Sequence, residues 1–86
     1  MNKTFSDRAF EDYIFWQANN KANLRKIKSL LKSIERDGTM QGEGKPEKLT
    51  YRKNDYSRRI DKENRLVYEI KDNTIIVKSC RGHYDD

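Results

Sequence analysis

The sequence has little of what would tie it to a membrane, a disulfide framework or a metal. Its 86 residues include one Cys, one Pro and one His. A single Cys cannot form an intrachain disulfide, and one Cys with one His cannot supply the four ligands of a structural zinc site. No apolar run is long enough to cross a bilayer, and residues 1–5 lack the apolar core of a signal peptide. We therefore expect a cytoplasmic protein without a metal or cofactor.

What the sequence has in excess is positive charge. Nineteen Lys and Arg against fourteen Asp and Glu give a net charge of +5 and a pI of about 9.4. This excess favours anionic partners, and RNA, DNA or an acidic protein all fit it. A chain this short buries only about 60 to 65% of its unfolded surface and cannot divide its core between two units. We predict one domain spanning residues 1–86.

The first half of the chain predicts two helices. Ser6 is placed to cap the first helix, whose apolar positions are Phe10, Tyr13, Ile14 and Trp16. Asn19-Asn20 interrupts this pattern, and a second helix of about residues 21–35 carries a stripe of Leu and Ile before Asp37-Gly38 ends it. Two such helices cannot shield both stripes alone, so a sheet must complete the core. The Lys and Arg residues of the second helix fit either solvent exposure or contact with a nucleic-acid backbone.

The second half of the chain predicts an antiparallel sheet. Residues 65–70 and 74–78 flank Asp72-Asn73, a dipeptide that tolerates positive φ and favours a two-residue hairpin turn. The register that follows from this turn pairs Lys71 with Thr74, Ile70 with Ile75, Tyr68 with Val77 and Arg65 with Cys80. The apolar pairs face the core, and the last pair faces outward. Residues 1–5 could add an edge strand.

A further strand, residues 56–60, is predicted to join this hairpin. A three-residue loop ending at Asn64 would connect them, with Asn64 in the left-handed conformation and Asp61 paired with Arg65. Strand parity then sends Ile60 to the core. The residues that it places on the outer face, close to Cys80, are Arg59, Arg65 and Val67.

Several residues together could cleave RNA without a metal. Such a reaction needs a base for the 2′-hydroxyl proton, cations for the phosphorane charge and an acid for the departing 5′-oxygen. Glu47 is a candidate base, and His83 is a candidate for proton transfer because histidine alone ordinarily titrates close to neutrality. Arg59 and Arg65 suit the cationic role, because a guanidinium binds two phosphate oxygens and stays charged. Tyr84 could stack on an RNA base.

Each of these residues also has an ordinary explanation. Paired strand arginines often form a solvated face, and Glu47 alone could be a loop carboxylate. A histidine near a chain terminus is often an exposed residue without a role. Strict alternation even points His83 toward the core side, away from the arginines, unless the strand ends or bends after Gly82. Trp16 is expected in the core rather than on RNA.

Five sequence blocks nevertheless stand out as an ordered set. They are Phe10-Glu11-Asp12-Tyr13 with Trp16-Gln17, Gly42-Glu43-Gly44-Lys45-Pro46-Glu47 with Leu49, Ser57-Arg58-Arg59-Ile60, Asn64-Arg65-Leu66-Val67-Tyr68, and Cys80-Arg81-Gly82-His83-Tyr84. Together they resemble the YoeB/Txe toxins of the RelE superfamily, which are ribosome-dependent mRNA interferases, and the likeness runs nearly end to end. The chain departs from the usual pattern in residues 51–55, which lack a common glycine, at Gly82, and in Asp85-Asp86 beyond the usual terminal Tyr.

The resemblance implies an α+β fold in which two N-terminal helices pack on a small twisted antiparallel sheet, the RelE-like microbial ribonuclease fold. By similarity, Glu47 is the general base, His83 the general acid and Arg65 the phosphate stabiliser, with Arg59 and Tyr84 assisting. The basic residues predicted to contact RNA are Lys45, Lys48, Arg58 and Arg81.

The resemblance also implies partners and products. It implies an acidic, partly disordered antitoxin that wraps the toxin, a ribosome that holds mRNA in its A site, and a second copy of the chain in a homodimer. It implies products with a 2′,3′-cyclic phosphate and a 5′-hydroxyl.

Two functions that need no catalysis stay open. One is a relative that blocks translation or a topoisomerase by binding alone. An endoribonuclease is favoured over these alternatives by the joint presence of Glu47, Arg65 and His83. A protein that only binds needs charge but not an acid and a base. The other is binding of double-stranded nucleic acid, for which no helix shows a reading-head pattern.

Overall fold

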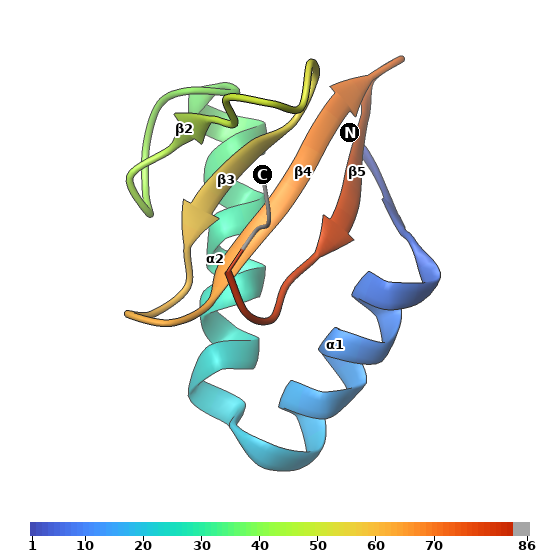
Figure 1. The fold of residues 1–86 in the computed structure, drawn as a ribbon, viewed down its shortest axis with the longest axis vertical. Helices are drawn as coiled ribbons and strands as arrows, with labels where there is room; N and C mark the ends of the chain where they lie inside the picture. The colour runs from blue at the N-terminus through green and yellow to red at the C-terminus, as the bar shows by residue number, and fades with distance from the viewer. Residues whose placement is uncertain (84–86) are drawn as a thin grey trace.

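The computed structural model describes residues 1–83 and has two layers, with two helices packed on one face of a five-stranded sheet (Figure 1). The elements in chain order are β1 (Asn2–Phe5), α1 (Asp7–Asn19), α2 (Lys21–Asp37), β2 (Glu47–Lys48), β3 (Tyr56–Arg59), β4 (Arg65–Lys71) and β5 (Thr74–Ser79). The strand order is β1-β5-β4-β3-β2, so β1 and β2 form opposite edges. Tyr84, Asp85 and Asp86 lie outside the described residues.

The predicted α+β fold is confirmed, but the sheet is mixed rather than purely antiparallel. The apolar start of the chain forms the expected edge strand, but β1 pairs with β5 in parallel, whereas every other pair of strands is antiparallel. Backbone bonds from Asn2 to Asn73 and from Ser6 to Val77 fix the two ends of this parallel pairing. Neither helix is long and apolar enough to cross a membrane.

Local capping chemistry sets the helix boundaries. Ser6 accepts a hydrogen bond from the Ala9 N–H at 3.1 Å and begins α1. Asn20 serves both helices, because its N–H donates to the Trp16 carbonyl that ends α1 and its side chain accepts from the Asn23 N–H that begins α2. Gly38, at φ 104°, ends α2. The predicted boundaries are therefore confirmed.

The rotation of α1 differs from the prediction. Phe10 and Ile14 are 58% and 44% exposed, while Trp16 is buried as expected. Two polar bonds to one residue of the C-terminal segment fix this rotation: the Trp16 indole donates to the Cys80 carbonyl at 2.8 Å, and Asp12 accepts from the Cys80 N–H at 2.9 Å. These two hydrogen bonds, rather than the apolar stripe predicted from the sequence, therefore determine which side of α1 faces the core.

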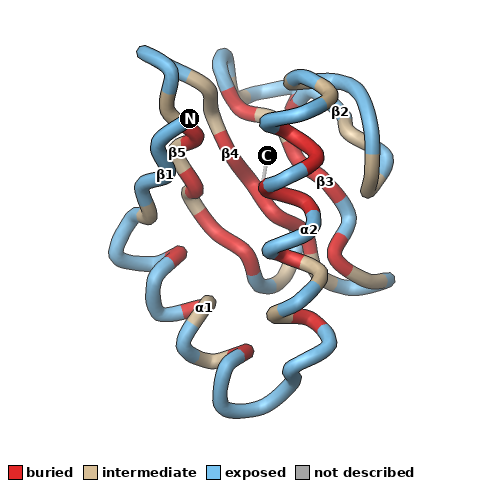
Figure 2. The backbone as a smooth tube through the Cα atoms, turned by 180° about the vertical axis from the view of Figure 1, so that it is seen from behind, coloured by how far each residue is buried: buried red, intermediate tan, exposed pale blue. Residues whose placement is uncertain are grey.

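The β4–β5 hairpin has the predicted register near its turn and a different one beyond it. Asp72 and Asn73 both have positive φ, and the pairs from Lys71–Thr74 to Tyr68–Val77 are those predicted. A register shift between Val67 and Tyr68 then places Val67 opposite Ser79. This irregularity turns Cys80 into the core, where it is fully buried, so its predicted place opposite Arg65 on the outer face is wrong. Figure 2 shows α2 lying across the sheet, with buried stretches along α2, β4 and β5.

The pairing of β3 with β4 is displaced by two residues from the prediction. Arg59, rather than Asp61, lies opposite Arg65, and Asn64 does not have positive φ. The Asp61 carboxylate shapes the loop instead, by accepting from the Glu63 and Asn64 N–H groups at 2.8 Å. A displacement of two residues preserves parity. Arg59 and Arg65 therefore share the outer face, and Ile60 is buried, as predicted.

Arg58 is a fully buried residue on the core side of β3, so its predicted role in RNA contact is wrong. Its guanidinium donates to Tyr68 Oη, Ser33 Oγ and the carbonyls of Gly38, Thr39, Gln41 and Glu43, at 2.6 to 3.3 Å. Buried polar groups need such partners, and these carbonyls all belong to the loop that precedes β2. Arg58 therefore connects that loop to α2 in the helical layer and to β4 in the sheet.

Gly44 allows the end of this loop to approach the sheet closely. Its carbonyl accepts from the Arg59 N–H at 2.6 Å, and a Cβ at this position would lie 2.6 Å from Leu30 Cδ2. The residue also has a φ of 88°, which side chains disfavour. The loop is thus pinned at the point where the chain turns into β2.

We expect Arg58→Met to lower the free energy of unfolding by about 3 kcal/mol or more, because the buried Ser33 and Tyr68 and several part-buried carbonyls lose their donor. Arg59→Met is a matched control, since this neighbouring side chain is exposed, and should change stability by less than about 0.5 kcal/mol. Urea unfolding followed by tryptophan fluorescence measures both. Equal effects of the two substitutions would contradict the anchoring role of Arg58.

Candidate functional site

A row of residues crosses the outer face of the sheet, opposite the helices. Pairing places Glu47 of β2 opposite Ser57 of β3, Ser57 opposite Val67 of β4, and Val67 opposite Ser79 of β5. Residues in such a row share one face. Glu47 thus lies on the same face as Arg59 and Arg65, although it belongs to the edge strand β2 and directly follows the loop that Arg58 anchors.

Arg65 is the centre of the site. Its side chain, only 9% exposed, donates from Nε to Ser57 Oγ at 3.1 Å and places Nη2 3.3 Å from Glu47 Oε1. The Glu47 side chain is 48% exposed. Ser57 is fully buried, and the hydrogen bond that its hydroxyl accepts holds the Arg65 guanidinium in its orientation. The site therefore presents an oriented cation beside an accessible carboxylate.

The C-terminal segment is attached to the strand that carries Arg65. The Gly82 carbonyl accepts from the Arg65 N–H at 3.0 Å, and the Gly82 N–H donates to Asn64 Oδ1 at 2.7 Å. His83, the next residue, is exposed. Because β5 ends at Ser79 and its register has shifted, the strict alternation that pointed His83 toward the core does not apply. The backbone of His83 therefore begins next to Arg65.

Helix α1 supports the same segment from the other side. The Arg81 guanidinium lies over the Phe15 ring, 3.5 Å from its centroid, and Arg8 donates to the Arg81 carbonyl at 3.3 Å. Cation–π stacking leaves the outer face of the guanidinium accessible, and Arg81 is exposed. RNA contact by Arg81 stays a prediction.

Arg59 provides a second cation on this face. It lies directly opposite Arg65 and is exposed, and within residues 1–83 no hydrogen bond or ion pair engages its side chain. Like charges opposite one another on neighbouring strands are unfavourable unless an anion is shared between them. This pair therefore favours binding of a phosphate group.

The two lysines predicted to contact RNA lie in different settings. Lys45 is exposed with a φ of 50°, at the end of the anchored loop. The Lys48 ammonium donates hydrogen bonds to the Leu49 and Arg52 carbonyls, at 3.2 and 2.6 Å. These bonds close the turn between β2 and β3. RNA contact by either residue stays a prediction, and Lys48 has a structural role in addition.

Sequence reasoning missed the residues that support the site. Ser57 orients Arg65, and Asn64 holds Gly82. Neither role has a local signal, because each depends on the register of a strand pair rather than on neighbours in the chain. Tyr84, predicted to assist, lies outside the described residues. Among residues 1–83, no three His, Cys, Asp or Glu side chains group as a metal site would require.

The fold and this sheet face agree with the class that comparison with known families assigns to the chain, the toxins of bacterial type II toxin–antitoxin systems. A family described as the YoeB-like toxin of bacterial type II toxin-antitoxin system matches residues 5–84, and the chain belongs to that family. Toxin YoeB of Synechocystis is 44% identical over 85 residues, covering 98% of each chain.

Solved structures agree with this assignment. The YoeB dimer from Staphylococcus aureus has a TM-score of 0.93 and 53% identity, with 98% of each chain covered. The YoeB–YefM complex from the same organism has a TM-score of 0.91 and 54% identity, again with 98% of each chain covered. The sequence-based resemblance is therefore confirmed.

We expect Asp61, whose loop places Asn64, to give the fold a pH-dependent contribution. Partial burial works to raise the pKa of Asp61, but hydrogen bonds from Asn23, Glu63 and Asn64 outweigh it and lower the pKa. A lowered pKa in the folded state contributes stability above the unfolded pKa of about 3.9, and this is lost as pH falls through the folded value. Asp61→Asn should therefore destabilise the protein at neutral pH, with the difference from wild type shrinking in acid.

Urea unfolding of wild type and Asp61→Asn at pH 7 and at about pH 3 measures this difference. Asp72→Asn, in the exposed hairpin turn, is the control and should stay within about 0.5 kcal/mol of wild type. A destabilisation by Asp61→Asn that is equally large at both pH values would show that the charge of Asp61 is not involved.

Proposed function

We propose that this toxin is a ribosome-dependent endoribonuclease that cleaves mRNA in the A site by acid–base catalysis without a metal. One observation carries the proposal. Arg65 contacts Glu47 through its side chain, at 3.3 Å, and Gly82, the residue before His83, through its backbone, at 3.0 Å. Arg65, the proposed phosphate-binding cation, thus contacts both the candidate base and the backbone of the residue that precedes the candidate acid, which supports the proposal.

The proposed reaction needs no reactant besides the RNA. Glu47 takes the proton of the 2′-hydroxyl, whose oxygen attacks the adjacent phosphorus. The bond from phosphorus to the 5′-oxygen breaks, and His83 donates a proton to that oxygen. The products carry a 2′,3′-cyclic phosphate and a 5′-hydroxyl.

The arginines supply the electrostatic part of the mechanism. Arg65 is already oriented by Ser57 before substrate arrives, so little reorganisation is needed when negative charge develops on the phosphorane oxygens. Arg59, opposite Arg65, is placed to share that charge. Tyr84 would assist by stacking on a neighbouring base, and Lys45, Lys48 and Arg81 would contact the RNA backbone.

The proposal includes partners and a location. The Staphylococcus aureus relative is solved as a dimer and in complex with YefM. By likeness, we propose that this chain forms a homodimer, is neutralised by a cognate acidic antitoxin, and acts in the cytoplasm where ribosomes and mRNA are found.

Substitution of either proton-transfer residue tests the mechanism. Glu47→Gln and His83→Gln should each slow cleavage of ribosome-bound mRNA by about 10²- to 10⁴-fold, because general acid–base catalysis contributes that much. Binding to the ribosome, measured by co-sedimentation, should be unchanged. Single-turnover loss of intact mRNA gives the rates.

Glu63→Gln is the matched control, since Glu63 is an exposed carboxylate in the β3–β4 loop. This variant should cleave mRNA at the wild-type rate. Wild-type rates for Glu47→Gln or His83→Gln would refute that residue's assignment. Translation arrest by the wild-type protein with all mRNA intact would favour inhibition by binding alone.

A further inference from the structure

Two consecutive residues, Asn64 and Arg65, hold the backbone of Gly82, one residue before the candidate acid. After β5 ends at Ser79, the chain turns back to the start of β4 (Figure 1). There the Gly82 N–H donates to Asn64 Oδ1 at 2.7 Å, and the Gly82 carbonyl accepts from the Arg65 N–H at 3.0 Å. We call this pair of hydrogen bonds the Gly82 clamp.

Gly82 is a position at which the chain needs such a clamp. Its φ is 82°, a conformation that glycine adopts far more readily than other residues, and a Cβ added there would meet no atom within 4 Å. No side chain and no neighbour on that side therefore restrains the segment that leads to His83. One hydrogen bond alone would let this segment rotate about it, whereas two bonds to different groups fix its direction.

The Asn64 side chain is itself held in one orientation. Its Nδ2 donates to both carboxylate oxygens of Asp61, at 3.0 and 3.1 Å. Because an ionised carboxylate only accepts hydrogen bonds, the amide turns its NH2 group to Asp61 and its oxygen to Gly82. The backbone carbonyl of Asn64 accepts from the Ile60 N–H at 2.9 Å, so the main chain of this residue is fixed as well.

Asp61 connects the clamp to the helical layer. Its carboxylate accepts from Asn23 Nδ2 at 3.0 Å, and Asn23 lies in the first turn of α2, where it is buried. A chain of hydrogen bonds thus runs from α2 through Asp61 and Asn64 to Gly82. Connected polar side chains of this kind rigidify a structure. The direction in which the chain leaves Gly82 is therefore set by the folded core.

We propose that Asn64 is a positioning residue, which directs His83 toward the phosphate site at Arg65 by holding Gly82. This inference rests on the proposed function, in which His83 protonates the departing 5′-oxygen. A general acid must come within hydrogen-bonding reach of that oxygen, and a misplacement of about 1 Å costs as much as about 10²-fold in rate. Asn64 itself transfers no proton, because its amide is engaged by Asp61 and Gly82.

The position of His83 can be measured without any cleavage, because His83 is the only histidine of the chain. In protein without a histidine tag, its imidazole Cε1–H gives a single NMR signal. Asn64→Ala should shift this signal and narrow its line, because the residue before His83 becomes mobile. In the wild-type protein, the Gly82 amide should exchange with solvent at least about tenfold more slowly than in an unstructured peptide, a test that needs no substitution.

Single-turnover cleavage of ribosome-bound mRNA tests the catalytic consequence. Asn64→Ala should lower the maximal rate constant by about 10- to 10²-fold, while the toxin concentration that gives half of that maximum stays within about twofold of wild type. In a His83→Gln background, the same substitution should change the rate by less than about twofold, because a residue that acts through His83 has nothing left to position.

The leaving group provides a second readout that a general loosening of the fold would not move. In an mRNA whose scissile 5′-oxygen is replaced by sulfur, the leaving thiolate needs no proton from an acid. Asn64→Ala should therefore cleave this mRNA at nearly the wild-type rate.

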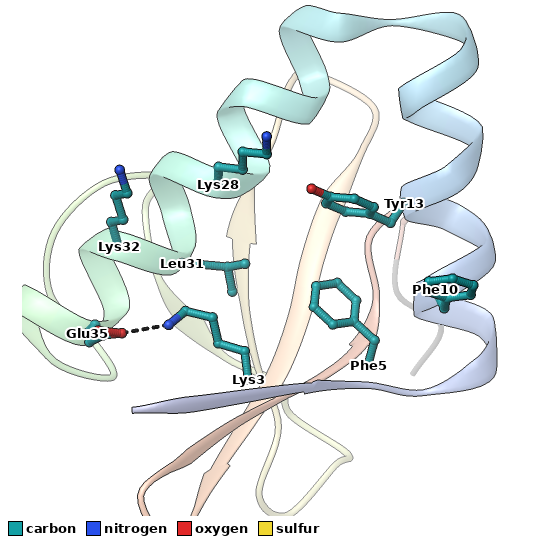
Figure 3. A pocket seen from close by; sticks show the side chains of 8 residues that line it. All are labelled: Lys3, Phe5, Phe10, Tyr13, Lys28, Leu31, Lys32 and Glu35. Carbon is teal, nitrogen blue, oxygen red and sulfur yellow. Dashed lines mark hydrogen bonds and ion pairs between the residues drawn. The ribbon is translucent and has the colours of Figure 1, made fainter.

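Two other alanine substitutions are matched controls. Glu63→Ala truncates the exposed neighbour of Asn64 in the same loop. Phe10→Ala removes a ring that is 58% exposed at the cavity between β1, α1 and α2 (Figure 3). Both variants should keep the wild-type His83 signal and cleavage rate. Circular dichroism establishes that all variants are folded.

The proposal is overturned if Asn64→Ala leaves the His83 signal unchanged, or if the Gly82 amide exchanges as fast as in an unstructured peptide. It is also overturned if Asn64→Ala slows the His83→Gln variant as much as it slows wild type, since Asn64 would then act through Arg65 or the fold. Wild-type cleavage that depends on His83 but not on Asn64 would reject this inference alone. Absence of cleavage by the wild-type protein would reject the proposed function, and with it any catalytic role of Asn64.

Discussion

The buried guanidinium of Arg58 is the interaction on which the rest of the structure depends. The loop between α2 and β2 turns several part-buried carbonyls inward, and leaving any of them without a donor would be costly. One side chain supplies donors to the carbonyls of Gly38, Thr39, Gln41 and Glu43, and also bonds Ser33 of α2 and Tyr68 of β4. Glu47 begins β2 directly after this loop, so its position on the outer face follows from a contact in the core.

The other half of the site depends on the irregular end of β5. The register shift near Val67 brings Cys80 into the core, where Trp16 and Asp12 of α1 bind its backbone. The chain then returns to β4 at Gly82, held by Asn64 and by the Arg65 N–H. Loop and tail thus reach Arg65 from opposite sides. The site is assembled by long-range polar contacts, while the layers are held by apolar packing.

Local patterns in the sequence predict the elements but not these contacts. The caps at Ser6 and Gly38 and the Asp72-Asn73 turn are local, and the helices and hairpin they define are confirmed. Arg58 is buried and Arg59 exposed because neighbouring strand residues point to opposite faces of the sheet. The carbonyls that bind the buried guanidinium come from a loop that is distant in sequence. Likewise, the exposure of Phe10 depends on where Cys80 lies. Resemblance to known toxins points to Glu47, Arg65 and His83, whereas Ser57 and Asn64 emerge only from the strand register.

The proposed mechanism makes one demand that no binding-only toxin shares: the scissile 5′-oxygen must leave as a hydroxyl after attack by the neighbouring 2′-oxygen. The most direct test is the chemistry of the RNA ends after the wild-type toxin acts on ribosomes holding mRNA. The account predicts downstream fragments that begin in the A-site codon and accept phosphate from polynucleotide kinase without prior dephosphorylation. Fragments that begin with a 5′-phosphate, or arrested ribosomes with intact mRNA, would contradict it.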